Sequence, residues 1–118
     1  MSNWSPFKRP ALVSFGRPLT PELKAAAATT GTVCLDWGGV IELDGRQIGV
    51  THGHMDIDVR RVLDRQPDYL LFGHLHFPVD SREGSVRRIN PGALSRTDEC
   101  SVAILDLETD ELRFLIVP

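Results

Sequence analysis

Four histidines lie in two short, glycine-containing loops of the sequence, and their spacing suits metal binding. His52 and His54 directly follow one apolar run, and His74 and His76 follow the next. Neutral imidazole is the commonest protein ligand for zinc, iron and similar divalent ions. Because successive side chains of an extended segment alternate, His74 and His76 would point into one site while Leu75 turns towards the core. We therefore predict that three or four imidazoles converge on a metal ion.

Each loop by itself also fits a simpler interpretation. A single His-x-His is often a pair of polar loop residues, and Gly53 and Gly73 are also ordinary turn residues. Two such loops occur here, however, one at each end of a single connecting segment. This pairing favours the metal site over the simpler interpretation.

The segments around the histidine loops predict the elements that position them. Residues 40–43 and 47–50 flank Asp44-Gly45, a pair that favours a tight hairpin turn. Residues 69–72 are a continuous apolar run, which is typical of a strand buried on both faces. Between the loops, apolar residues at helical spacing predict an amphipathic helix that ends before Pro67. The charged residues of this helix fall on its outer, solvated side: Asp58, Arg60, Arg61, Asp64 and Arg65.

This predicted helix would act as a crossover between two parallel, neighbouring strands. Both histidine loops would then lie at the same carboxyl edge of the sheet. Open α/β sheets bind their ligands at that edge. The elements therefore support the same site as the histidine spacing.

A third loop, Asn90-Pro91-Gly92, follows a predicted strand at residues 86–89. Asn-Pro and Pro-Gly both end strands, so a plain turn is its simplest interpretation. The alternative places the Asn90 side chain or the loop amides beside a bound anion. In that case Arg96 would reach a phosphate at the same edge of the sheet.

The remaining segments complete a strand-rich α/β fold. Residues 1–18 contain three prolines without a clear period and are predicted to form an irregular arm. Thr20 and Pro21 predict the start of a helix, as its cap and its first residue. The predicted domain therefore spans residues 19–118. It closes with two further strands, at residues 102–105 and 112–117.

Composition narrows the classes of function. The 118 residues are 42% apolar and 25% charged, which is typical of a globular domain and excludes a disordered chain. A net charge of −3 provides no overall basic surface for nucleic acid, and no apolar stretch approaches the ~20 residues of a membrane helix. Two cysteines make no disulfide framework, and no apolar signal segment is visible. We therefore expect a protein of the reducing cytoplasm.

The order of these motifs resembles a known family. The sequence is similar to the C-terminal half of the calcineurin-like metallophosphoesterases, in particular their small bacterial and archaeal phosphodiesterase branch. That branch includes the retromer scaffold subunit of the same fold. The likeness covers residues 20–118 and rests on three motifs: His52-Gly53-His54, Gly73-His74-Leu75-His76 and Asn90-Pro91-Gly92-Ala93.

The resemblance implies a four-layer α/β/β/α sandwich that holds two divalent ions (manganese, iron, zinc or nickel) and hydrolyses phosphodiesters. By position, His52 and His74 would bind the second ion and His76 the first. In such a site the two ions hold the phosphate and activate a water for in-line attack on phosphorus. The other matched residues would support these ligands or face the phosphate: His54, Asn90, Gly92 and Arg96.

The sequence departs from the family pattern where the family supplies carboxylate ligands. It contains neither Asp-x-His nor Gly-Asp, and Gly16-Arg17-Pro18-Leu19 stands where the family has Gly-Asn-x-Asp. We therefore expect a truncated domain with impaired hydrolysis, whose histidines hold at most one weakly bound ion. The alternatives are a non-catalytic metal-binding or assembly module, and a site that a second polypeptide completes.

The resemblance also predicts partners. The family's N-terminal half supplies strands and helices that cover the sheet, and an uncovered apolar sheet is an association surface. We expect a homo-oligomer, or a partner chain, that buries this face. An active site would take a small phosphoester as its substrate, and the sequence indicates no partner membrane or nucleic acid.

Overall fold

The computed structural model describes residues 13–14, 21–30, 33–34, 38–53 and 55–118. The chain divides into two compact units, residues 1–37 and residues 38–118. The boundary that the sequence predicts after residue 18 falls among residues outside the described ranges, so it stays a prediction. Within the described ranges, no helix is long and apolar enough to cross a membrane.

The described residues of the first unit form one helix and one pair of short strands. In the sequence, α1 (Pro21–Thr30) lies between β1 (Val13–Ser14) and β2 (Val33–Cys34), and the two strands pair in parallel. The helix begins at Pro21 as predicted, because proline fits the first helical position, where an N–H would have no partner in the helix. The predicted cap, Thr20, lies outside the described residues.

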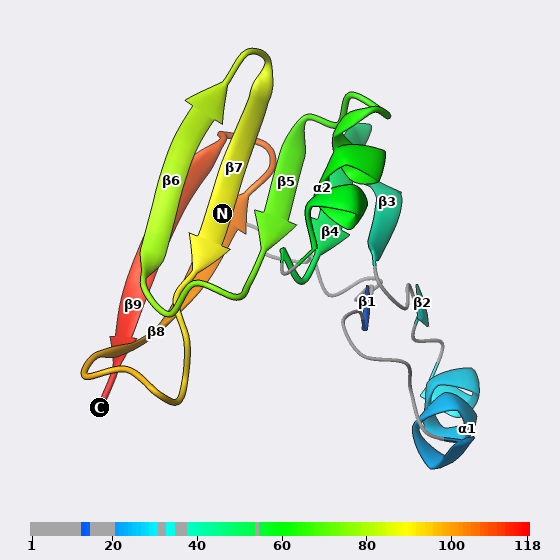
Figure 1. The fold of residues 1–118 in the computed structure, drawn as a ribbon, viewed down its shortest axis with the longest axis horizontal. Helices are drawn as coiled ribbons and strands as arrows, with labels where there is room; N and C mark the ends of the chain where they lie inside the picture. The colour runs from blue at the N-terminus through cyan, green and yellow to red at the C-terminus, as the bar shows by residue number, and fades with distance from the viewer. Residues whose placement is uncertain (1–12, 15–20, 31–32, 35–37, 54) are drawn as a thin grey trace. The chain divides into compact units, whose positions relative to one another are not determined.

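The second unit is built on a five-stranded mixed sheet in the order β3-β4-β5-β7-β6 (Figure 1). Strands β4, β5 and β7 are parallel, and the two edge strands are antiparallel to their neighbours. The hairpin β8–β9 forms a second sheet. The bounds are β3 Gly38–Leu43, β4 Arg46–Thr51, α2 Asp56–Leu63, β5 Tyr69–Phe72, β6 Pro78–Glu83, β7 Val86–Pro91, β8 Cys100–Asp106 and β9 Glu111–Val117. These elements confirm the predicted strand-rich α/β class, with β5 in the middle of the sheet.

Helix α2 connects β4 to β5 and packs on β3 and β4 (Figure 1). Its one buried residue, Val62, clusters with Leu70 of β5 and Val86 of β7. Gly49 of β4 permits this close packing, because a Cβ there would lie 2.4 Å from Val62 Cγ1. The predicted crossover between parallel neighbouring strands is therefore confirmed.

Strand β6 is an element that the sequence pattern does not predict. It begins with proline, and of its six residues only Val79 is partly buried. It is an edge strand that pairs on one side with β7, so it needs no alternating apolar residues to hold its place. Its pairing with β7 is local, through the two-residue turn Gly84-Ser85, but its exposed side chains carry no apolar alternation that would mark a strand.

Strand β7 is longer than predicted, because it runs to Pro91 and not to Ile89. Asn90 and Pro91 pair with Val79 and Pro78 of β6, so the prediction that Asn90 opens a loop is wrong. A proline is tolerated here because the ladder with β5 stops at Ile89, and Pro91 has no strand on that side to which it must donate.

A charged network attaches the β8–β9 turn to the five-stranded sheet. Arg87 of β7 donates two hydrogen bonds of 2.9 Å to Asp80 and lies 3.1 Å from a carboxylate oxygen of Asp110. The hydroxyl of Tyr69, on β5, donates to the same Asp110 carboxylate. The Arg87 hydrogen bonds hold the pKa of Asp80 below its usual value, and the Tyr69 hydrogen bond does the same for Asp110. Burial and the Asp110 contact raise the pKa of Tyr69.

Candidate metal site

His52 and His74 meet at the carboxyl edge of the sheet. They follow β4 and β5, whose parallel pairing ends with Thr51 opposite Phe72. The Gly73 amide donates a 3.0 Å hydrogen bond to the His52 carbonyl, so the two loops stay together beyond the sheet. The two ring centroids are 5.9 Å apart, and the ring planes are tilted by 55°. The structure thus brings together the first histidine of each predicted loop.

His74 has an uncommon backbone conformation. Its φ is +73°, in the left-handed region that residues other than glycine rarely occupy. Across it, the Leu75 amide donates a 2.9 Å hydrogen bond to the Gly73 carbonyl. A bond of this span around a central φ of about +75° marks the rare and strained form of the γ-turn. Strained backbone of this kind clusters at ligand-binding sites, and the His74 side chain is exposed there.

The Asn90 side chain contacts this turn on both sides of His74. Asn90 is 0% exposed, and its Nδ2 donates to the Gly73 carbonyl at 3.0 Å and to the Leu75 carbonyl at 3.1 Å. Its Oδ1 accepts a 2.9 Å hydrogen bond from the Gly92 amide. The side chain is therefore directed at the backbone of the histidine loop and of its own loop.

His76 and Arg96 are both exposed, and they contact one another. Nδ1 of His76 lies 3.2 Å from the carbonyl oxygen of Arg96, which has a φ of +59°. This contact joins the second histidine loop to the loop after β7. His54 lies outside the described residues, and its predicted supporting role stays a prediction.

The spacing of the His52 and His74 rings is close to that of two imidazoles on one metal ion. Metal–nitrogen distances of about 2.0–2.1 Å place two imidazoles on one zinc ion with centroids roughly 5–6 Å apart, and the pair falls in that range. Two rings supply two of the four ligands of a tetrahedral site. Among the described residues, no group of three or more His, Cys, Asp or Glu could hold an ion. The predicted ligand set of His52, His74 and His76 therefore stays a prediction.

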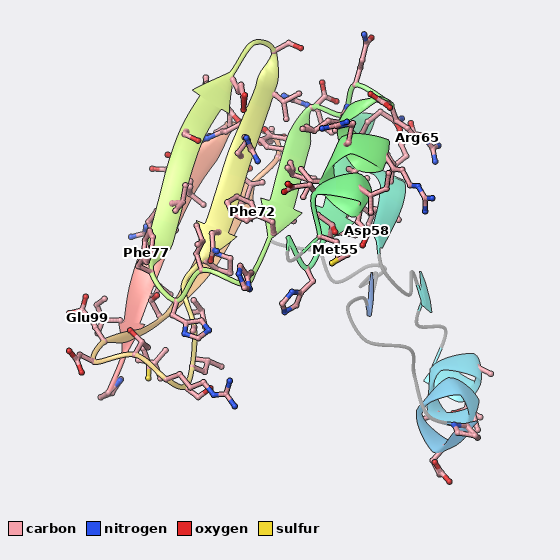
Figure 2. The ribbon with its side chains drawn as sticks, in the orientation of Figure 1. Met55, Asp58, Arg65, Phe72, Phe77 and Glu99 are labelled. Atoms are coloured by element: carbon pink, nitrogen blue, oxygen red, sulfur yellow. The ribbon has the colours of Figure 1, made fainter. Side chains whose placement is uncertain are left out.

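Exposed apolar side chains share the edge with the histidines. Figure 2 shows Met55 and Phe77 at the end of the five-stranded sheet where β4, β5 and β7 finish, and Arg65 at the opposite end. Met55 is 48% exposed and Phe77 is 57% exposed. Arg65 is exposed as well, as the sequence predicts for the outer side of the helical segment.

Sequence reasoning did not identify Gly73 and Leu75 as anchor points of the loop, because they act through their backbone carbonyls. The signal that could have revealed them is Asn90-Pro91-Gly92. Asn often bonds the amide two residues ahead, as Asn90 does with Gly92, whose φ is +96°. The same geometry leaves both amide hydrogens of Asn90 pointing at the neighbouring loop.

Comparison with known families gives one match that covers most of the chain. Residues 24–110 match the model of the calcineurin-like phosphoesterase superfamily domain. Phosphodiesterase YfcE of Escherichia coli K12 is 34% identical over 59 residues, which are 50% of this chain and 32% of YfcE. The matched segment therefore spans about a third of the length of that curated relative.

Solved structures agree with the fold. An archaeal phosphodiesterase superposes with a TM-score of 0.75 at 22% identity, over 92% of this chain and 70% of its own. Vps29 of Entamoeba histolytica, solved in complex with Zn²⁺, superposes with a TM-score of 0.52 at 16% identity, over 91% of this chain and 97% of its own. At these identities the likeness shows the fold alone.

Proposed function

The chain belongs to the calcineurin-like phosphoesterase superfamily, and on this premise we propose that residues 38–118 carry the histidine side of a metal-dependent phosphodiesterase site. In this proposal His52 and His74 bind one divalent ion, and His76 would bind a second ion only in a complete family site. A phosphodiester is the proposed substrate because the curated relative is a phosphodiesterase.

The distance between the His52 and His74 rings is the observation that carries the proposal. A separation of 5.9 Å lets both imidazoles reach one ion. The rings also lie at the carboxyl edge of parallel strands, where open α/β sheets bind their ligands. The strained backbone of His74 adds support, because such strain persists where the surrounding structure imposes it.

In the proposed hydrolysis, the metal ion would activate the phosphate and the water, and the histidines of the chain would hold the ion. When bound, a divalent ion of this kind would polarise the phosphoryl group and lower the pKa of the water that attacks phosphorus. The chain's own imidazoles would each bind through a neutral ring nitrogen. Imidazole ligands suit manganese less than zinc, iron or nickel, and all four ions remain candidates.

A non-catalytic metal-binding or assembly module is the second candidate, and two observations favour it. The part of the chain that the structure describes holds no cluster of three ligands, and the 118 residues contain neither Asp-x-His nor Gly-Asp. Under the first candidate, we therefore propose that these 118 residues hydrolyse phosphodiesters only weakly. The second candidate predicts metal binding with no hydrolysis.

We also propose that the chain associates through the outer face of β8–β9. Leu115 lies opposite Val102 in the register, with Val117 to one side of this pair and Ile104 to the other on the same face, which Arg113 also shares opposite Ile104. Ile104, Leu115 and Val117 are 38%, 41% and 37% exposed. Burial of this apolar strip against a second copy of the chain would remove it from water.

Hydrolysis of bis(4-nitrophenyl) phosphate, measured together with metal content, tests both functions. The first candidate predicts slow turnover that requires an added divalent ion, with Zn²⁺, Fe²⁺, Ni²⁺ and Mn²⁺ tried in turn, and that falls to the metal-free level in His74→Ala. Ile57→Ala, at an exposed position of α2, is the matched control and should retain turnover. Metal binding without turnover would favour the second candidate, and the absence of both would overturn the proposed site.

A further inference from the structure

We infer that Asn90 is a positioning residue, which holds His74 in its ion-binding orientation by clamping the carbonyl groups on either side of it. The clamp itself is a property of the backbone and can be tested without metal. The clamp matters for ion binding only if His74 is a metal ligand, as the proposed function states.

The partners of Asn90 fix the direction of its amide. The two Nδ2 hydrogens meet two carbonyl oxygens, those of Gly73 and Leu75, and Oδ1 meets the Gly92 N–H. A flipped amide would set Oδ1 against both carbonyls and Nδ2 against an N–H, so each contact would become repulsive. No side chain but asparagine or glutamine offers two donors and an acceptor in this form, and glutamine is one methylene longer.

The backbone of His74 needs support from outside the turn. A left-handed φ costs an L-residue roughly 1–2 kcal/mol, so the turn would relax to a negative φ if nothing opposed it. A change in the sign of φ would swing the imidazole away from its present direction. Because Asn90 binds the carbonyl before and the carbonyl after His74, it opposes rotation at both ends of the residue.

Asn90 lies where both of its amide hydrogens reach the histidine loop. It belongs to β7, one residue beyond the last pair with β5, and so reaches the first loop residues after β5. It is fully buried, and loss of its hydrogen bonds would leave a buried amide without partners, which costs free energy. The side chain is therefore restricted to the orientation that makes these bonds. The clamp is therefore part of the sheet and not of a surface loop.

Ser101 offers a matched control for a purely structural role. It is 2% exposed, and its Oγ donates a 2.9 Å hydrogen bond to the carbonyl of Pro91, the residue after Asn90. Its amide donates to the Ala93 carbonyl. Loss of the Ser101 hydroxyl thus removes one buried hydrogen bond at the same strand end, without removing a bond to the histidine loop.

The test uses the 118-residue chain and three variants, Asn90→Ala, Asn90→Asp and Ser101→Ala. Asn90→Asp keeps the side-chain volume and the acceptor but removes both donors. Asn90→Ala removes the side-chain amide without introducing a charge, so it provides the test if Asn90→Asp does not fold. Amide hydrogen exchange of Leu75, whose N–H closes the γ-turn, reports the clamp without metal. Titration with Zn²⁺ alone then reports its effect on binding.

We expect both Asn90 variants to speed Leu75 exchange at least tenfold relative to Ser101→Ala, and to weaken Zn²⁺ binding roughly 10–100-fold, as loss of a ligand's supporting contact does. Ser101→Ala should lower the melting temperature with little change in either quantity. Equal Leu75 exchange in the Asn90 and Ser101 variants would overturn the inference. Absence of Zn²⁺ binding to the unmodified chain would overturn the proposed function, while Leu75 exchange would still decide whether the clamp exists.

Discussion

Single residues with a positive φ shape the backbone next to the candidate site. Gly53 and Gly92 take φ values of +86° and +96°, and His74 takes +73° between them in the sequence. The two glycines adopt a positive φ at little cost in free energy, whereas His74 has a Cβ and is strained there. Hydrogen bonds from Asn90 hold His74 in this conformation. The side chain that would bind an ion is thus the one placed at the strained position.

Gly92→Ala should destabilise the fold more than Gly45→Ala. Both glycines have a positive φ, +96° and +76°, so each substitution incurs the left-handed penalty of roughly 1–2 kcal/mol. A Cβ on Gly92 would also lie 1.9 Å from Ser101 Oγ, whereas a Cβ on Gly45 meets nothing within 4 Å. We expect about 1–3 kcal/mol of further loss for Gly92→Ala, measured by urea unfolding. Equal losses in the two variants would contradict this account of the Gly92 turn.

At the scale of elements, the β8–β9 turn is attached to the sheet through Asp110. Tyr69 and Arg87 both contact its carboxylate, and Arg87 also pairs with Asp80 of β6. Strands β5, β6 and β7 are therefore all connected to one turn, directly or through Arg87. Most of these groups are partly exposed, so the network fixes the position of the hairpin more than it adds stability.

Tyr69 is the chain's only tyrosine, so phenolate absorbance reports its titration directly. Its pKa is raised by burial and by the Asp110 contact, so we expect a midpoint above 10. Since the folded pKa exceeds the unfolded one, the stability from this group is complete below about pH 10 and is lost as the pH rises through the folded pKa. Tyr69→Phe should cost about 1 kcal/mol at neutral pH and flatten the alkaline loss. A midpoint at or below 10 would contradict the buried hydroxyl.

Asp80 shows the opposite pH dependence. Its pKa is lowered by the Arg87 hydrogen bonds, so its contribution is complete above the unfolded value of about 3.9 and is lost as the pH falls through the folded pKa. We expect stability to drop below pH 4, and Asp80→Asn to make that drop smaller. Urea unfolding at pH 7 and at pH 3 checks this, and an unchanged drop in Asp80→Asn would show that the pair contributes nothing.

Elements marked by an apolar run or by the Asp-Gly turn were predictable, and an exposed edge strand without an apolar pattern was not. The Asp44-Gly45 hairpin and the continuous apolar strand at residues 69–72 were found because turn chemistry and burial on both faces leave a mark in the sequence. Strand β6 was missed because it is exposed and held by backbone pairing with β7. The contact of Asn90 with the His74 loop was missed because its partners are carbonyl groups, which every residue carries.

The two histidine loops show the same division within the site. Their placement at one edge followed from the crossover rule, and the 5.9 Å contact of His52 with His74 agrees with it. The γ-turn at His74 could not be inferred, because the enrichment of histidine at positive φ falls mostly in the left-handed helical region and does not specify a γ-turn.

At the scale of the whole molecule, the exposed strip on β8–β9 predicts association. Light scattering after size-exclusion chromatography should give a mass above that of one 13.1 kDa chain. Leu115→Glu should shift the equilibrium towards monomer, because it places a charge in the apolar strip. Ile57→Glu, at another exposed apolar position, is the matched control and should leave the mass unchanged. A stable monomer at high concentration would contradict the prediction.

The central claim is that His52 and His74 bind one ion together. The most direct measurement is a Zn²⁺ titration of the chain with ¹⁵N-labelled histidine, followed through the ring nitrogens of each histidine. Ring signals of His52 and His74 should shift together along one saturation curve, and His74→Ala should abolish the shift of His52. Independent curves for the two rings, or a His52 shift that persists in His74→Ala, would contradict the claim.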